Sequence, residues 1–272
     1  MSSIRKPSVA GFFYPSSPRK LRDEINLMLD VSKPEKEYNE VFGIVAPHAG
    51  YGYSGKTAAY AYNTVKDKNY ETVIVISPSH RQYFAGVSVY AGSAYRTPLG
   101  DAVINKEFVA KLIEADNVIF EGTHGHGAEH ALEVQIPFIQ TVFGNVTIVP
   151  LVMGDQKDSV VYRLAEAIAQ TTDEKTLVIA SSDLSHFYTK DSADKLDSVV
   201  EDNINSFNYE QLLADLNSRN CEACGGGPIA AMMKAAETKG YTNAKVLERT
   251  DSGDITGDYT EVVGYLSAVV YK

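Results

Sequence analysis

Cysteine is almost absent from this chain of 272 residues, which contains only Cys221 and Cys224. Two cysteines three positions apart, both late in the chain, cannot cross-link a protein of this size. The sequence therefore excludes a disulfide-stapled miniprotein and favours a reducing compartment.

Positive charge and long apolar segments are also scarce. Lys and Arg number 25 against 35 Asp and Glu, a formal net charge of −10, and no basic cluster extends beyond short pairs. Such a composition gives no electrostatic support to a groove for a nucleic-acid backbone. The apolar run 262–271 is much shorter than the about 20 residues of a membrane-spanning helix, and the run 9–14 is too short for a signal peptide. We expect a cytoplasmic protein without membrane or nucleic-acid partners.

Short β-branched segments alternate along the chain with longer segments of helical periodicity. The pattern predicts strands at 43–46, 72–76, 87–90, 146–152, 176–180, 244–247 and 262–270. It predicts helices at 18–29, 55–65, 106–115, 129–143, 159–170, 192–205 and 227–239. Near-continuous apolar strands such as 73–76 are typical of strands buried on both faces. The alternation predicts an α/β fold with a central, mostly parallel sheet flanked by helices, in one domain covering residues 1–272.

Three predicted strands end in polar residues that suit chemistry. His48 follows the strand at 43–46, and His80 follows the strand at 72–76. Asp183 and His186 follow the strand at 176–180. Because ligands of open α/β sheets bind beyond the carboxyl ends of the strands, we expect these side chains to converge.

The histidines at these strand ends are candidate metal ligands. A single loop histidine is most often a solvated or structural residue, but histidines at equivalent strand ends are less simply explained that way. Two neutral imidazoles and one anionic group form a site for a divalent transition metal with open positions. Asp183, His186 or a cysteine would supply the third group.

Cys224 precedes a glycine-rich turn, and Pro228 lies in the first turn of the predicted helix. A thiol near a helix N-terminus has its thiolate form favoured, which suits metal ligation or nucleophilic chemistry. A buried structural cysteine is the alternative. The segment 123–130 is dense in histidine and glycine; it offers further donors, although capping and solvent contacts explain His124, His126 and His130 equally well.

A competing pattern lies at residues 50–57, which match the P-loop spacing of glycine, lysine and threonine. This reading assigns phosphate binding to Lys56 and magnesium binding to Thr57 in a nucleotide hydrolase. Two bulky residues, Tyr51 and Tyr53, oppose it because a P-loop must wrap tightly around phosphates. The alternative is a glycine-rich turn that leads into a helix.

Six motifs, in order and over nearly the full chain, resemble the Memo family. They lie at residues 9–15, 47–51 with 54–55, 78–80, 129–133, 181–186 and 224–229. The resemblance also accounts for residues 50–57, which continue the motif that begins at Pro47. The Memo family in turn resembles the catalytic subunit of class III extradiol dioxygenases, which implies a single α/β domain with a metal cleft at one edge of the sheet.

The resemblance also implies roles for individual residues. His48, His80 and Cys224 match the metal ligands of the family. Asp183 and His186 match polar residues of the same cleft, with His186 placed as the catalytic acid/base and Asp183 expected to orient it. Tyr51, Glu129 and His130 are expected to line the cleft.

One departure from the dioxygenases concerns the metal. They complete their ligand set with a carboxylate, whereas this chain offers Cys224. A thiolate is softer and redox-active, which favours copper, zinc or a differently tuned iron and weakens the expectation of ring opening. We expect a divalent transition metal, iron first and copper or zinc as alternatives.

The leading hypothesis is a metal-dependent redox enzyme, resembling a dioxygenase, with an unknown small-molecule or peptide substrate. The alternative is a non-catalytic binding or adaptor protein, because animal members of the family act in receptor signalling and bind phosphotyrosine peptides. Proteins of the AMMECR and radical-SAM types are the partners that the resemblance implies.

Overall fold

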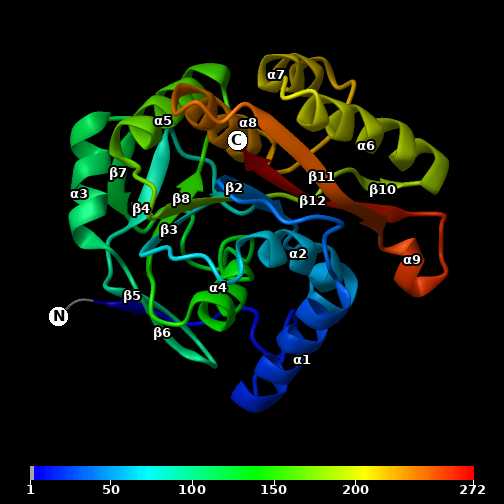
Figure 1. The fold of residues 1–272 in the computed structure, drawn as a ribbon, viewed down its shortest axis with the longest axis horizontal. Helices are drawn as coiled ribbons and strands as arrows, with labels where there is room; N and C mark the ends of the chain where they lie inside the picture. Colours follow the sequence, from blue (N-terminus) through cyan, green and yellow to red (C-terminus); the bar gives the residue numbers. More distant parts are fainter. Residues whose placement is uncertain (1–2) are drawn as a thin grey trace.

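The computed structural model describes residues 3–272 of the chain. Within this part, the main sheet contains nine strands with the following bounds: β2 Val41–Ala46, β3 Thr72–Pro78, β4 Val87–Tyr90, β7 Ile119–Gly122, β8 Thr147–Met153, β9 Thr176–Ser181, β10 His186–Tyr188, β11 Asn243–Asp251 and β12 Val262–Tyr271. Their order is β10-β12-β2-β9-β3-β8-β4-β7, with β11 also paired to β12. Figure 1 shows this sheet crossing the middle of the molecule.

The four central strands β2, β9, β3 and β8 pair in parallel. Each of the residues Val73–Ile76 and Leu177–Ala180 is fully buried, as the continuous apolar pattern predicts. Antiparallel pairs flank this centre, β12 against β2 and β4 against β8. The predicted α/β class is confirmed. The sheet as a whole is mixed, because antiparallel pairs lie on both sides of its parallel centre.

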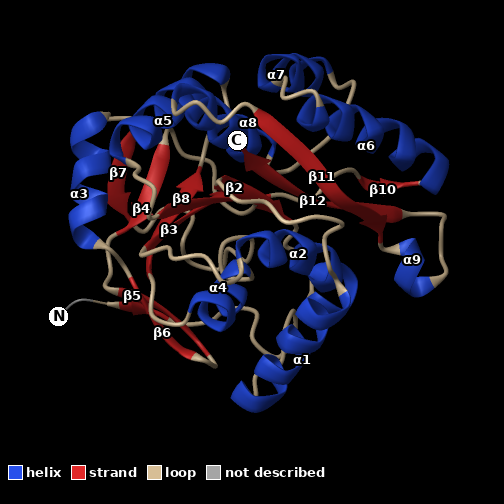
Figure 2. Ribbon diagram, in the orientation of Figure 1, coloured by secondary structure: helices blue, strands red, loops and turns tan. Residues whose placement is uncertain are grey.

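Helices cover both faces of the sheet (Figure 2). Their bounds are α1 Pro18–Val31, α2 Tyr51–Val65, α3 Lys106–Ala115, α4 Gln135–Phe143, α5 Asp158–Thr171, α6 Lys190–Asn205, α7 Tyr209–Ser218, α8 Gly226–Thr238 and α9 Gly253–Thr256. One face carries α1, α2 and α4, and the other carries α3, α5 and α8, with α6 and α7 packed beside α8 and the β11–β12 pair. One hydrophobic core extends through both layers. From residue 3 onward, every helix is too short or too polar to cross a membrane.

A second, small sheet joins the N-terminal segment to a hairpin from later in the chain. Its strands are β1 Ile4–Arg5, β5 Ala94–Thr97 and β6 Gly100–Val103, in the order β1-β5-β6. This sheet places Arg5 in the interior, where it is 5% exposed.

All fourteen predicted helices and strands are present; β4 and α3 have the predicted bounds, and the others have shifted ends. The largest shift is at the helix predicted for 129–143, which begins at Gln135. Its first residues instead form turns, because the Glu129 carboxylate accepts the backbone N–H groups of His130 and Ala131. The elements that the sequence did not predict are α7, α9 and five strands of two to four residues: β1, β5, β6, β7 and β10.

Candidate metal centre

The carboxyl ends of three adjacent strands bring the candidate ligands together. His48 follows β2, His80 follows β3, and Asp183 and His186 follow β9, which lies between them. The ring centroids of His48 and His80 are 5.2 Å apart. Donor atoms of His48, His80 and Cys224 all lie within 4.8 Å of one another. The expected convergence is therefore present in the structure.

Cys224 reaches this edge of the sheet from the connection between α7 and α8. Its backbone N–H donates to the Asp183 carbonyl at 3.2 Å, and the next backbone N–H, from Gly225, donates to Ser182 Oγ at 2.9 Å. A Cβ at position 225 would lie 2.2 Å from the Ser181 carbonyl oxygen, so the approach requires glycine. The Cys224 Sγ lies 3.2 Å from His48 Nε2.

Hydrogen bonds at the other ring nitrogen fix the tautomer of His48. The Ser181 hydroxyl donates to the Ala131 carbonyl at 2.8 Å and accepts from the Gln135 amide at 2.9 Å. The Ser181 oxygen can therefore only accept from His48 Nδ1, which lies 2.9 Å away. The lone pair of His48 is left on Nε2, the nitrogen that faces Cys224.

Glu129 performs the corresponding task for His80. Its carboxylate accepts the His80 backbone N–H at 2.6 Å and the His80 Nδ1–H at 3.0 Å. Burial opposes the negative charge of Glu129, but the hydrogen bonds from His80 and Ala131 outweigh it and lower the pKa of Glu129 to about 2. Because the carboxylate engages Nδ1, Nε2 is the ring nitrogen of His80 that remains to bind a metal.

The protonation of the donors depends on their burial. Burial, together with the neighbouring His80 and His130, holds the pKa of His48 well below its ordinary value, so this ring is neutral. Burial and the Asp183 carboxylate raise the pKa of the Cys224 thiol. This differs from our expectation of a thiolate favoured by the helix N-terminus, because burial outweighs the helix. A divalent cation would favour the thiolate form of Cys224, so the two imidazoles and the buried thiol fit a transition metal.

Asp183 is not the partner that we expected for His186. Its Oδ1 accepts the backbone N–H of His48 at 2.7 Å, and burial raises its pKa to about 7. The ring of His186 is oriented instead by the Leu184 carbonyl, which accepts from Nδ1 at 2.8 Å. Asp183 thus holds the backbone of His48, and Nε2 of His186 has no hydrogen-bond partner among residues 3–272.

The three residues expected along the cleft have different positions. The ring of His130 stacks on His80 with centroids 4.9 Å apart, and Glu129 lies behind both rings. Tyr51 differs from the expectation, because it is buried in the core and its hydroxyl donates to the Val134 carbonyl at 2.8 Å. The hydroxyl of Tyr51 is therefore not directed at the metal donors.

The structure also bears on the P-loop pattern at residues 50–57 and on the histidines of the segment 123–130. Residues 51–57 form the first turns of α2, so Lys56 and Thr57 do not lie on a phosphate-binding loop. His126 is a buried structural residue, bonded through Nδ1 to the Tyr95 hydroxyl and through Nε2 to the Ser88 carbonyl. His124 packs against Phe84 and Phe120.

An ion pair that sequence reasoning missed supports the segment around Glu129. Arg5 pairs with Glu133 and donates to the backbone carbonyls of His126, Gly127 and Glu129. Glu133 also accepts from the Tyr14 hydroxyl at 2.6 Å. The signal available in the sequence was that both Tyr14 and Glu133 lie within Memo motifs, whereas Arg5 lies outside them.

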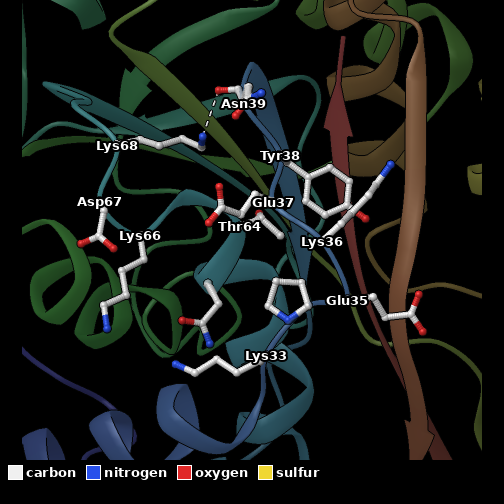
Figure 3. A pocket seen from close by; sticks show the side chains of 12 residues that line it. Lys33, Glu35, Lys36, Glu37, Tyr38, Asn39, Thr64, Lys66, Asp67 and Lys68 are labelled. Atoms are coloured by element: carbon white, nitrogen blue, oxygen red, sulfur yellow. Dashed lines mark hydrogen bonds between the residues drawn. The ribbon is translucent and has the colours of Figure 1, made fainter.

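A separate hollow is lined by residues other than the candidate ligands. Figure 3 shows a cavity of about 530 Å³ between the α1–β2 connection and the end of α2, where Lys68 donates to the Asn39 carbonyl. Lysine and acidic side chains both line it, and the metal donors do not. This hollow is therefore not part of the candidate metal centre.

Comparisons with known proteins give a consistent result. A family model described as Memo-like protein matches residues 5–269. The chain is 37% identical to a MEMO1 family protein of Thermoplasma volcanium, with 99% of each chain covered. It is 38% identical to a MEMO1 family protein of Methanocaldococcus jannaschii, with 99% of this chain and 100% of the relative covered. An uncharacterized Escherichia coli K12 protein of known crystal structure has a similar fold, with a TM-score of 0.51 and 13% identity over 85% of this chain and 99% of that one.

Proposed function

The chain belongs to the Memo-like protein family, and from the donor set at its sheet edge we propose that it is a metal-dependent redox enzyme with a small-molecule substrate. One observation carries this proposal: donor atoms of His48, His80 and Cys224 lie within 4.8 Å of one another. Both histidines are hydrogen-bonded through Nδ1, so Nε2 is the ring nitrogen left to bind a metal. Such pre-orientation is typical of metal ligands rather than of structural histidines.

The three side chains would hold one divalent ion, iron first and copper or zinc as alternatives. Iron or copper supplies one-electron chemistry and coordination positions for O₂ or substrate. The protein itself positions the ligands. Ser181 and Glu129 keep the ligand rings in place, and Asp183 holds the backbone of His48.

His186 is the proposed acid/base. Its Nδ1–H is bound to the Leu184 carbonyl, so Nε2 is the atom that accepts and later returns a proton. Burial lowers the pKa of His186, which keeps the ring neutral near pH 7 and able to accept a proton from a bound substrate.

The test is the metal content of protein purified without oxygen, measured by elemental analysis. We expect near-stoichiometric iron or copper in the wild type and loss of the metal in Cys224→Ser. Cys221→Ser is the matched control, because Cys221 is buried and lies outside the donor cluster. A wild-type protein that is purified empty and takes up neither iron, copper nor zinc would overturn the proposal.

Exposed aromatic side chains favour one second candidate, a binding protein that uses the same cleft. Phe12, Tyr83 and Phe187 are 88%, 73% and 70% exposed. Tyr83 lies three residues after His80 and Phe187 directly follows His186. Phe12 precedes Phe13, whose ring packs against His130. Aromatic residues at such positions suit recognition of a peptide or of a partner protein, for which AMMECR-type and radical-SAM proteins are the candidates. Peptide affinity that His186→Ala leaves unchanged would favour this candidate, whereas turnover that requires His186 would favour the enzyme.

A further inference from the structure

A second hollow adjoins the candidate metal centre. This cavity, of about 470 Å³, has Cys224 and His186 in its lining together with residues of α7 and of the connection between α7 and α8. Gln156 also lines it, donating to the Cys224 carbonyl at 2.8 Å and accepting from the Gly227 N–H at 2.8 Å. A molecule in the cavity would therefore touch one proposed metal ligand and the proposed acid/base.

One part of the cavity wall is apolar. Leu184 and Leu213 are buried, at 1% and 4% exposure, and Leu216 and Ala223 complete the surface. A volume of this size fits an organic ligand of small-molecule size. The apolar surface favours a ligand with a hydrocarbon or aromatic body.

The charged groups of the cavity are Arg219 and Glu222. Glu222 accepts the Tyr188 hydroxyl at 2.6 Å, whereas Arg219 forms no ion pair with any residue from 3 to 272. Two other polar side chains of the lining are engaged within the protein: the Asn217 amide donates to Asp158 at 3.0 Å, and Gln156 bonds to the backbone of Cys224 and Gly227. In a protein of net charge −10, the unpaired Arg219 guanidinium is therefore the positive charge that a ligand in the cavity meets, beside the carboxylate of Glu222.

The backbone of Arg219 supports a role for its side chain. Arg219 ends α7 in the left-handed region with φ 62°, where glycine is the usual residue. Its backbone N–H donates to the Leu216 carbonyl at 3.2 Å, and Asn220 N–H donates to Asp215 at 2.8 Å, which holds the turn. The chain thus keeps an arginine at a strained position on the cavity lining.

We propose that this cavity binds the substrate, an organic anion whose apolar body lies against Leu184, Leu213 and Leu216 and whose carboxylate or similar group pairs with Arg219. The cavity's place in catalysis rests on the proposed function, but binding of the anion itself does not require the metal. Arg219 is then the residue that determines specificity for an anion, since a guanidinium binds a carboxylate through two parallel hydrogen bonds.

The experiment measures binding of 3-phenylpropionate by NMR titration, with the neutral 3-phenylpropanol as the comparison probe. Both chelator-treated protein and protein reconstituted with metal are used. For the wild type we expect a Kd on the order of millimolar, as for other ligands of this size. The neutral probe should bind about tenfold more weakly or worse, because a charge-assisted hydrogen bond is lost.

Arg219→Gln should weaken 3-phenylpropionate binding about tenfold, and Arg219→Lys should weaken it less, because lysine keeps the charge without the paired hydrogen bonds. Arg22→Gln is the control, since Arg22 lines a different cavity of similar size that is remote from the metal donors. Arg219 is exposed, so its replacement should leave the fold intact.

The outcomes separate this inference from the proposed function. Arg219-dependent binding to chelator-treated protein supports the cavity whether or not the chain takes up metal. Absence of binding, or binding that Arg219→Gln leaves unchanged, overturns the proposal that this cavity binds an organic anion through Arg219. Binding that requires metal but does not change in Arg219→Gln also overturns the proposed anion site, although it remains consistent with the proposed metal centre.

Discussion

The carboxylate of Glu129 holds His80 at two points, accepting the backbone N–H at 2.6 Å and the ring Nδ1–H at 3.0 Å. One acidic side chain therefore sets both the position of the loop after β3 and the orientation of the ring on it. This makes Glu129 a positioning residue of the candidate metal centre.

Glu129→Gln is expected to weaken metal binding by about ten- to a hundredfold, as is usual when a hydrogen-bond partner of a metal-bound histidine is lost. An amide offers one acceptor oxygen where the carboxylate offers two, and its NH₂ group would oppose an N–H donor. Competition with a chromophoric chelator measures the affinity. Glu121→Gln, which removes only an exposed partner of Lys106, should bind metal as the wild type does; equal affinities in the two variants would contradict this role.

Gly225→Ala should lower both metal affinity and stability. The added Cβ would lie 2.2 Å from the Ser181 carbonyl oxygen, so the segment that carries Cys224 must move away from β9. Gly52→Ala is the control, because its Cβ would have no neighbour within 4 Å among the described residues, and alanine favours the helix by up to about 1 kcal/mol. Urea denaturation and metal titration check both variants, and a Gly225→Ala protein with wild-type metal affinity would contradict the geometry.

Glu133→Gln should destabilise the protein by about 3–5 kcal/mol, because it leaves Arg5 charged and without its partner in the interior. Arg5 and Glu133 have side-chain exposures of 5% and 0%. The exposed pair of Arg96 and Asp101 provides the comparison, and Asp101→Asn should cost at most about 1 kcal/mol. Free energies of unfolding from urea titrations decide between them; similar losses in the two variants would show that burial does not set the cost.

His126 should make the stability depend on acid pH. Burial lowers its pKa to about 3 in the folded state, whereas an unfolded histidine titrates near 6.5. Between these values the unfolded chain binds a proton that the folded chain does not, so stability falls as the pH falls, by up to about 1.4 kcal/mol per pH unit from this residue.

The difference between wild type and His126→Gln isolates this contribution, because the other titrating groups are common to both proteins. Unfolding free energies of chelator-treated protein, measured from pH 7 to pH 4, should decrease less steeply in the variant. Parallel curves would contradict the assignment of a neutral, buried His126.

The sequence predicts those helices and strands whose residues form a local pattern of apolar and polar side chains. The apolar strands around Ile74 and Val178 have both faces buried, so their composition identifies them and the polar residues that follow. The segment 129–134 is different, because the Glu129 side chain competes for the backbone N–H groups of the predicted helix. The strands β1, β5 and β6 are too short to carry a period and depend on partners elsewhere in the chain.

Long-range contacts explain why the site was predicted only in part. Its ligands follow strands and motifs, which a sequence reveals. The partners that orient them, Ser181 for His48 and Leu184 for His186, act through a hydroxyl and a carbonyl whose neighbours are fixed only by tertiary packing. The burial of Tyr51 has the same origin, since its place in the core depends on α4 packing against α2.

The position of β9 between β2 and β3 would couple ion binding at the proposed metal centre to the folding equilibrium. His48, His80 and Cys224 are remote from one another in the chain and meet only after three parallel strands and α8 have assembled, so the denatured ensemble has no comparable binding site. An ion with selective affinity for the native state shifts this equilibrium by mass action, and the thermal midpoint rises with its free concentration. If the proposed metal centre holds such an ion, its depletion in a cell would reduce the amount of folded protein as well as the occupancy of the site.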